Sequence, residues 1–236
     1  MVIAVSVWAD PADPVDPRVI ALATSLGNNP TAIHQYVRNS IGIEVYSGSL
    51  RGARGTLASK AGNPLDRASL TVALLRAAGF SARYAQGTLS TPQADELFAR
   101  MFADPARILG CSNDPPRFSG NASADLAEGL RSHTWVEYRS GSSGPYTSLD
   151  TAFASASPGQ TFTVVTQNFD AIPASQRHTV RIRLEVETFT QAAAAFGLAL
   201  GTQMVLDQSF DSADLVDKPV TLSHFVDSYK IGRAHV

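Results

Sequence analysis

The most pronounced hydrophobic pattern in the chain is an apolar run over residues 65–78. Alanine, leucine and valine fill nearly every side of the helix that this run would form, which is typical of a helix buried all round. Asn63 is a candidate N-cap, Pro64 suits the first helical position, and Asp66 places a carboxylate at the positive end of the helix dipole. Gly79 provides the stop. The pattern therefore predicts one central, buried helix.

Capping residues and apolar positions spaced three or four apart predict three further helices. They cover residues 17–26, 30–41 and 94–109. The stretch 47–62 is rich in glycine and serine, and we expect a long loop there.

Strand signals follow the central helix at residues 80–86, 133–139 and 146–149. A buried helix followed by such strands predicts an α+β fold, in which the helix packs on an antiparallel sheet. The period-two geometry of a strand places Glu137 either toward solvent or opposite Arg83.

A change in composition near residues 155–159 marks the start of a β-rich segment. The stretch 192–200 within it is either a helix or an apolar loop. In the β-rich segment as a whole, alternating apolar and polar positions predict strands at residues 161–165, 178–186, 205–206 and 220–222.

These patterns divide the chain into four segments. Residues 1–16, with prolines clustered toward their end, are predicted to be an extended linker, and residues 17–157 to be the α+β domain. Residues 158–230 are expected to form a β-rich partial domain. Residues 231–236 match the translation of a common sequencing-library adapter, so we interpret them as an artefact and expect the natural protein to be longer.

Composition and charge argue against several classes of function. Of the 236 residues, 44% are apolar and 17% are charged, so a sizeable core is expected. The formal net charge is -2 and no basic stripe is present, which argues against nucleic-acid binding. No apolar run approaches the roughly 18 residues of a membrane span. Because Cys111 is the single cysteine and the histidines lack metal-ligand spacing, no disulfide, metal or other cofactor is predicted.

Four sequence blocks stand in a fixed order along the α+β domain. They are residues 61–66 (AGNPLD), 73–84 (ALLRAAGFSARY), 133–137 (HTWVE) and 149–150 (LD). This order resembles the transglutaminase-like family, which has a papain-like fold and a nucleophilic cysteine at the start of its buried helix. The resemblance covers residues 17–155 and implies a papain-like core ahead of the β-rich segment.

The resemblance implies catalytic roles for a small set of residues. In the family a thiolate attacks a carbonyl, a histidine takes the thiol proton, and an aspartate orients the histidine. His133 and Asp150 match that histidine and aspartate, whereas alignment on Asp66 places Pro64 where the family has its cysteine. The two matching residues are thus a residual dyad, and Cys111 is an alternative nucleophile. Its place in a loop after a different predicted helix favours an incidental thiol.

Two roles stay open for His133. Its hydrogen bond to Asp150 would join two strands in a purely structural role, or the ring would keep a contact with a ligand or a part in chemistry. Asn63, Asp66 and Trp135 are candidate ligand-binding residues, and Trp135 is also expected in the core or in the wall of a cleft.

Two functions are compatible with this pattern. The first is a degenerate, non-catalytic module that is structural or binds a peptide, protein or glycan, with other domains of the same parent chain as partners. The second is a cysteine-type acyltransferase or hydrolase that uses Cys111 with His133 and Asp150. The run at 49–56 (SLRGARGT) is similar to modules of large bacterial surface proteins, which implies a bacterial envelope or secreted location.

Overall fold

A computed structural model describes residues 16–101, 129–188, 201–218, 221–226 and 229–235. The described residues form two compact units, one ending at Arg177 and the other beginning at His178. The predicted linker 1–16 falls outside the described residues except for Asp16, and the stretch 192–200 falls wholly outside them.

The central helix α4 (Pro64–Ala77) is confirmed where the apolar pattern predicts it. The Asn63 side chain caps it by accepting a hydrogen bond from the Asp66 backbone N–H at 2.8 Å, and Pro64 takes the first turn. Nearly every residue of α4 is buried, including Leu70 and Leu74 with no exposed surface. Such burial on all sides explains why the helix has no polar face.

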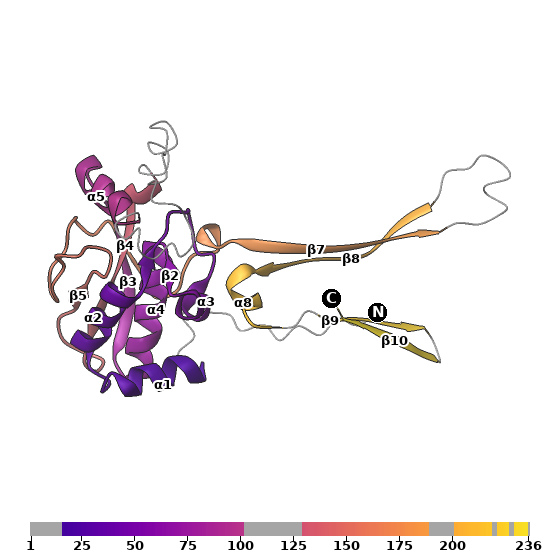
Figure 1. Cartoon of the computed structure of the whole chain (residues 1–236), viewed down its shortest axis with the longest axis horizontal. Helices are drawn as coiled ribbons and strands as arrows, with labels where there is room; N and C mark the ends of the chain where they lie inside the picture. Colours follow the sequence, from indigo (N-terminus) through magenta and orange to yellow (C-terminus); the bar gives the residue numbers. More distant parts are fainter. Residues whose placement is uncertain (1–15, 102–128, 189–200, 219–220, 227–228, 236) are drawn as a thin grey trace, which may run out of the picture. The chain divides into compact units, whose positions relative to one another are not determined.

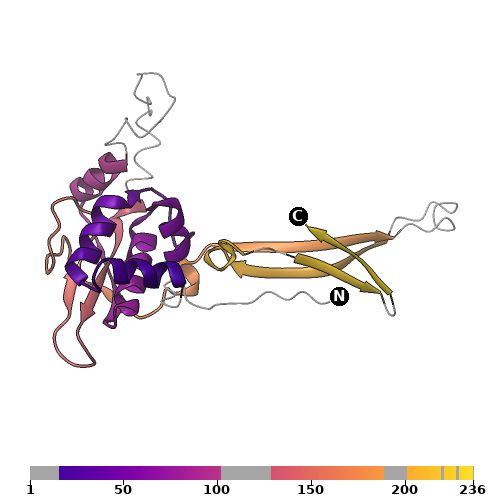
Figure 2. The same ribbon diagram turned by 60° about the horizontal axis from the view of Figure 1, so that its bottom comes forward.

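Three helices pack around α4 (Figure 1), and Figure 2 shows them from a second direction. They are α1 (Pro17–Ser25), α2 (Pro30–Ser40) and α3 (Gly52–Ser59). The helices α1 and α2 are confirmed, and Asp16 and Asn29 cap them with their side chains.

The predicted long loop at 47–62 is wrong in its second half. It contains α3 and the short strand β2 (Ala61–Gly62), which pairs in parallel with β1 (Gly42–Ile43). No side chain within α3 or just before it caps this helix. Its first N–H groups are instead bound by the carboxylate of Asp66, so the signal for its start lies outside the local sequence.

The sheet of the first unit is antiparallel and has the strand order β5-β4-β3-β6. In chain order the strands are β3 (Ser81–Thr88), β4 (Ser132–Arg139), β5 (Thr147–Leu149) and β6 (Gln167–Phe169). The first three lie where the sequence predicts them. This is the α+β arrangement expected from a buried helix followed by antiparallel strands.

The first unit continues past the predicted boundary at 157. The predicted strand at 161–165 is wrong, because regular pairing begins only at β6, whose residues pair with Tyr84–Gln86 of β3. Without β6, β3 would be an edge strand with unpaired N–H and C=O groups, and β6 satisfies part of that edge. The unit ends at Arg177, after the short 3-10 helix η2 (Ala174–Gln176).

Two hydrophobic clusters fill the first unit. The larger lies between α4 and the sheet and includes Leu74, Tyr84 and Val136. The smaller surrounds Phe153 and includes Leu97 of α5 (Thr91–Met101). The predicted helix 94–109 is described only as far as Met101, the last residue of α5.

The second unit is made of two hairpins and a short helix. The strand β7 (Thr179–Thr188) pairs antiparallel with β8 (Gly201–Asp211), which confirms the alternating pattern at 178–186. The remaining elements are α8 (Ser212–Leu215), β9 (Thr221–Val226) and β10 (Tyr229–His235). No helix in the described part of the chain has both the length and the apolarity to span a membrane.

Candidate functional site

His133 and Asp150 form a buried hydrogen-bonded pair. His133 lies near the start of β4 and Asp150 directly follows β5, so adjacent strands bring the two side chains together. The distance from His133 Nε2 to Asp150 Oδ2 is 2.7 Å. The two side chains are 0% and 1% exposed, so solvent does not compete for this hydrogen bond.

The backbone around Asp150 is held from two helices. His34 of α2 donates from Nε2 to the Asp150 carbonyl oxygen at 2.7 Å, since a carbonyl can only accept. Arg67 of α4 donates to the next carbonyl, that of Thr151. The second carboxylate oxygen of Asp150 accepts from the Ala152 N–H at 2.9 Å. These bonds fix the direction in which the carboxylate holds the His133 ring.

Arg67 is a fully buried cation in the core. Its guanidinium donates to the carbonyl oxygens of Ile41, Val37 and Thr151. Burial disfavours the charged form and lowers the pKa of Arg67 to about 9, and the nearby Arg100 acts in the same direction. At neutral pH Arg67 remains charged, and its three carbonyl partners offset part of the stabilisation that burial removes, while its buried Nε has no partner among the described residues.

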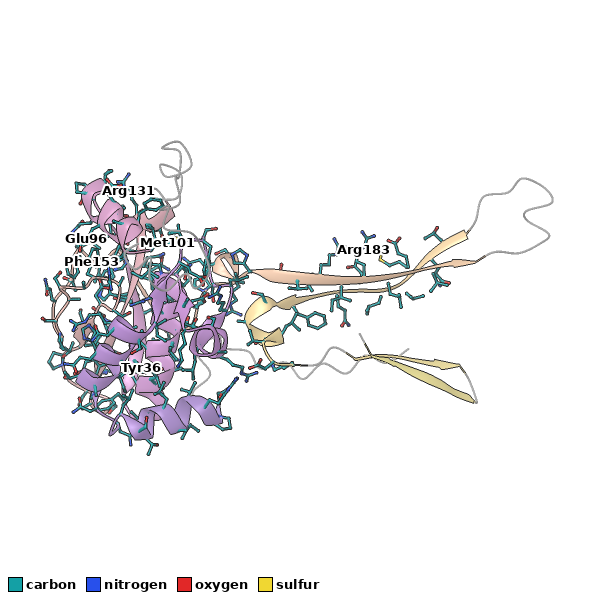
Figure 3. All side chains as sticks on the ribbon, viewed as in Figure 1. Tyr36, Glu96, Met101, Arg131, Phe153 and Arg183 are labelled. Atoms are coloured by element: carbon teal, nitrogen blue, oxygen red, sulfur yellow. The ribbon has the colours of Figure 1, made fainter. Side chains whose placement is uncertain are left out.

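Aromatic side chains enclose the His133 ring. Trp135 stacks with it at a centroid distance of 5.8 Å, and Phe153 meets it edge-on at 5.5 Å. Phe162 in turn stacks on Phe153 at 3.9 Å, and Figure 3 labels Phe153. Apart from the Asp150 carboxylate, the ring is therefore surrounded by aromatic surface and shielded from solvent.

A segment after β5 closes over the same face of the sheet. Gly87 is the cross-strand partner of His133, so the two residues point to one face. A Cβ on Gly87 would lie 2.3 Å from the carbonyl oxygen of Val164 and 2.8 Å from a methyl carbon of Thr163. Only glycine lets the chain pass this close, and the passing segment helps to bury Trp135.

The free nitrogen of His133 defines what the pair can do chemically. When Asp150 is ionised it accepts from Nε2, which leaves the lone pair on Nδ1. Nδ1 is buried and has no hydrogen-bond partner among the described residues. This is the protonation pattern of a general base whose orientation is fixed by a carboxylate.

The start of α4 presents no nucleophile. Pro64 occupies the first turn, and its ring has neither a reactive group nor a backbone N–H. The preceding Asn63 uses its amide nitrogen to donate to the carbonyl oxygens of Tyr46 and Gly48, at 2.8 and 2.7 Å. Its polar atoms therefore hold the loop before the helix as well as capping the helix.

A pocket of about 150 Å³ opens beside this helix start. Among the described residues that line it, the phenol of Tyr46 is the one ionisable group, so the wall is uncharged at neutral pH and combines apolar surface with a few amides and hydroxyls. It is lined by Tyr46, Ser47, Gly48, Asn63, Pro64, Leu65, Gln86, Gly129, Leu130, Ser132, Thr134 and Gln176.

Asp66 organises the loop that forms one side of the pocket. Its carboxylate accepts from the hydroxyls of Tyr46 and Ser49, both at 2.7 Å. It also accepts from the backbone N–H groups of Leu50, Arg51 and Gly52 at 2.8–3.1 Å. Because both oxygens are occupied by protein donors, the observed role of Asp66 is structural, and ligand binding by it stays a prediction.

The remaining predicted residues are placed as follows. Trp135 is 1% exposed, and its Nε1 has no partner among the described residues, so it forms part of the wall around His133. The expected pairing of Glu137 with Arg83 is confirmed, at 2.8 and 2.9 Å. Cys111 lies outside the described residues, so its relation to His133 stays a prediction.

Sequence reasoning missed His34 and Arg67 as partners of the Asp150 segment. For Arg67 a signal existed, because a cation inside a helix that is apolar all round must find buried partners. For His34 no local signal existed, since its partner lies far away in the chain. No group of three or more metal-ligating side chains gathers in the described parts of the chain.

The fold and the site define an α+β protein with a papain-like core, in which helices pack on an antiparallel sheet ahead of a β-hairpin segment. The chain belongs to the transglutaminase-like superfamily, whose family profile matches residues 15–151. A search of the curated proteins finds no match.

Among solved structures, the chain is similar to a presumed cysteine protease from Cytophaga hutchinsonii. The sequence identity is 16% and the TM-score is 0.40, over 82% of this chain and 50% of that one. The chain thus spans about half the length of that structure.

Proposed function

We propose that this chain is a degenerate transglutaminase-like module that does not use the cysteine mechanism of its family. It serves as a structural or ligand-binding domain within a larger bacterial envelope or secreted protein. The observation that carries this proposal is Pro64 at the first turn of α4. The resemblance between the sequence blocks assigns that position to the family's nucleophilic cysteine.

Two properties are lost when proline replaces cysteine there. A thiol at a helix start is activated by the helix dipole and by a neighbouring imidazole, and proline has no group to activate. A backbone N–H at the helix start can stabilise an oxyanion, and proline has no N–H. The dyad of His133 and Asp150 is therefore left without the partner on which it would act.

Hydroxyl groups in the pocket do not replace the thiol. Ser132 and Thr134 line the pocket and flank His133 in β4. Successive residues of a strand point to opposite faces of a sheet, so these hydroxyls lie on the face opposite the His133 ring. The Ser132 hydroxyl also accepts a hydrogen bond from Gln86 at 3.1 Å.

The pocket beside Pro64 supports a binding role. Amides and hydroxyls line it, which suits hydrogen bonding to the uncharged backbone of a peptide or to the hydroxyls of a glycan. Trp135 then serves to keep the sheet and the His133 ring in place rather than to stack on a ligand. Other domains of the parent chain are the partners expected for a module of this kind.

One observation favours a second function, a cysteine-type acyltransferase or hydrolase. His133 Nδ1 is buried without a partner among the described residues, while Nε2 is oriented by Asp150. A thiol brought to Nδ1 would complete a catalytic triad. Cys111 is the only cysteine in the sequence and is the candidate for that thiol.

Alkylation of Cys111 by iodoacetamide separates the two functions. For a non-catalytic module, the labelling rate at neutral pH is that of an ordinary thiol with a pKa of about 8.5, and His133→Ala leaves it unchanged. Rapid labelling that is lost in His133→Ala would instead establish the enzyme.

A second experiment tests the position of Pro64 directly. In a Cys111→Ser background, a Pro64→Cys thiol that stands at the family's nucleophile position would react rapidly at neutral pH and slow at least tenfold in His133→Ala. Ser132→Cys is the matched control, because its thiol would line the same pocket but face away from the imidazole. Equal rates for the two thiols would show that Pro64 does not stand at the nucleophile position.

A further inference from the structure

Strand β7 of the second unit has one apolar and one charged face. In the register of the hairpin, Val180 is opposite Phe210 and Leu184 is opposite Leu206, and cross-strand partners share a face. Ile182 and Val186 lie on this same face by the period-two rule. Two of these residues, Val180 and Val186, are 41% and 42% exposed, so the described residues leave the apolar face partly uncovered.

The second edge of β7 also lacks a partner among the described residues, where β7 pairs only with β8. A two-stranded hairpin is marginally stable in water, and a long unpaired edge is a template for another strand. Charged side chains lie along this strand on the face opposite the apolar one. Arg183 and Glu185 of that row are 47% exposed and form an ion pair with each other at 2.8 Å, Arg181 pairs with Asp207 of β8, and Figure 3 labels Arg183.

The charges of β7 are self-complementary about Leu184. The strand reads Arg-Ile-Arg-Leu-Glu-Val-Glu from residue 181 to residue 187. If two copies pair antiparallel with Leu184 opposite Leu184, Arg183 faces the partner's Glu185 and Arg181 faces the partner's Glu187. The two-fold axis generates a second copy of each of these two ion pairs. Ile182 then faces the partner's Val186 on the apolar side.

Other registers lack this match. Moving the axis to Arg183 or to Glu185 puts two like charges directly opposite each other, which is destabilising. A shift by one residue sets charged positions against the apolar face. Only the register centred on Leu184 pairs every charge of residues 181–187 with its opposite.

We infer that β7 is a dimerisation edge, through which two copies of this chain form a four-stranded antiparallel sheet with the order β8-β7-β7-β8. The contact is isologous, with a two-fold axis at Leu184. It doubles the width of the apolar face and pairs the exposed edge. This inference is independent of whether the first unit is an enzyme.

Disulfide cross-linking tests the register. In a Cys111→Ser background of the full chain, Leu184→Cys places two thiols directly opposite, at a Cα separation of about 4.5–5.5 Å that a disulfide can bridge. In the control Ile182→Cys the two thiols are four residues apart along the strands, roughly 13 Å, which a disulfide cannot bridge. We expect rapid cross-linking of the first variant and at least tenfold slower cross-linking of the second. Equal rates, or no cross-link at Leu184→Cys, would overturn the inference.

Charge-exchange variants test whether the partner of β7 is a second copy of this chain. The dimer Kd of the full chain is measured by sedimentation equilibrium. Arg183→Glu and Glu185→Arg each place like charges opposite, so each is expected to raise the dimer Kd at least tenfold. An equimolar mixture of the two variants restores every opposite pair as a heterodimer, and the double variant restores the homodimer. The restored species also show that the substitutions do not unfold the hairpin.

Three results would contradict a β7 dimer. The first is a wild-type chain that stays monomeric at every accessible concentration. The second is a dimer whose Kd is unaffected by either charge variant, because the interface would then lie elsewhere. The third is a mixture of the two variants that fails to associate, since the ion pairs would then not determine the pairing.

Discussion

The carboxylate of Asp66 gives the most direct prediction about stability. It accepts hydrogen bonds from Tyr46, Ser49, Leu50, Arg51 and Gly52 and is itself 0% exposed. The substitution Asp66→Asn keeps the shape of the side chain, removes its charge, and replaces one acceptor oxygen by an amino group. Whichever oxygen is replaced, the new amino group faces at least one backbone N–H.

The expected decrease in the free energy of unfolding has two contributions. A buried backbone N–H without an acceptor costs about 1–3 kcal/mol. Bonds to a charged acceptor contribute roughly twice as much as neutral ones, so the surviving bonds weaken by about 1–2 kcal/mol in total. Together the loss is about 2–5 kcal/mol, which is a substantial part of the roughly 5–15 kcal/mol that stabilises a typical domain. The loop before α3 and the pocket wall should loosen first.

Urea unfolding monitored by tryptophan fluorescence measures this loss. A Trp8→Phe background leaves Trp135 of the first unit as the single reporter. With an m-value of about 2 kcal/mol/M, the midpoint should fall by about 1–2.5 M. Asp170→Asn, the same change at an exposed position, is the control and should change stability by less than about 0.5 kcal/mol. If Asp66→Asn loses under about 1 kcal/mol, the carboxylate does not organise the loop as argued.

Two further predictions concern the surroundings of the buried pair. Gly87→Ala should destabilise the first unit by about 1–3 kcal/mol, because its Cβ meets the Val164 carbonyl, and should red-shift Trp135 fluorescence as the covering segment moves away. An unshifted spectrum would contradict this. Burial lowers the pKa of His34 from its ordinary value of 6.5, so the unfolded chain binds more protons on acidification. The contribution of His34 to the free energy of unfolding should therefore be fully present above pH 6.5 and decrease as the pH falls below that value. Urea unfolding at pH 7, 6 and 5 measures this decrease, and His34→Gln should make it smaller.

Local signals were sufficient for the helices of the first unit. Asp16, Asn29 and Asn63 each stand directly before a helix and cap it, so the sequence alone placed α1, α2 and α4. By contrast, α3 begins at N–H groups bound by Asp66, which comes later in the chain. A prediction that depends on neighbouring residues cannot detect such a cap.

The site shows the same division between local and distant signals. The blocks around His133 and Asp150 identified the pair, and the structure brings the two side chains together. The carbonyl contacts made by His34 and Arg67 depend on how α2 and α4 pack, and no local pattern encodes that packing. The alternating pattern at 161–165 was misleading, because Thr163 contacts the end of β3 through its side chain and the ladder of β6 begins only later.

The pairing of β6 with β3 has a practical consequence for dissecting the protein. The family profile stops at residue 151, yet a fragment cut there would lack the strand that covers Tyr84–Gln86. Such a fragment would offer its open strand to neighbouring molecules and tend to aggregate. Recombinant work on the first unit should therefore keep the chain through Arg177.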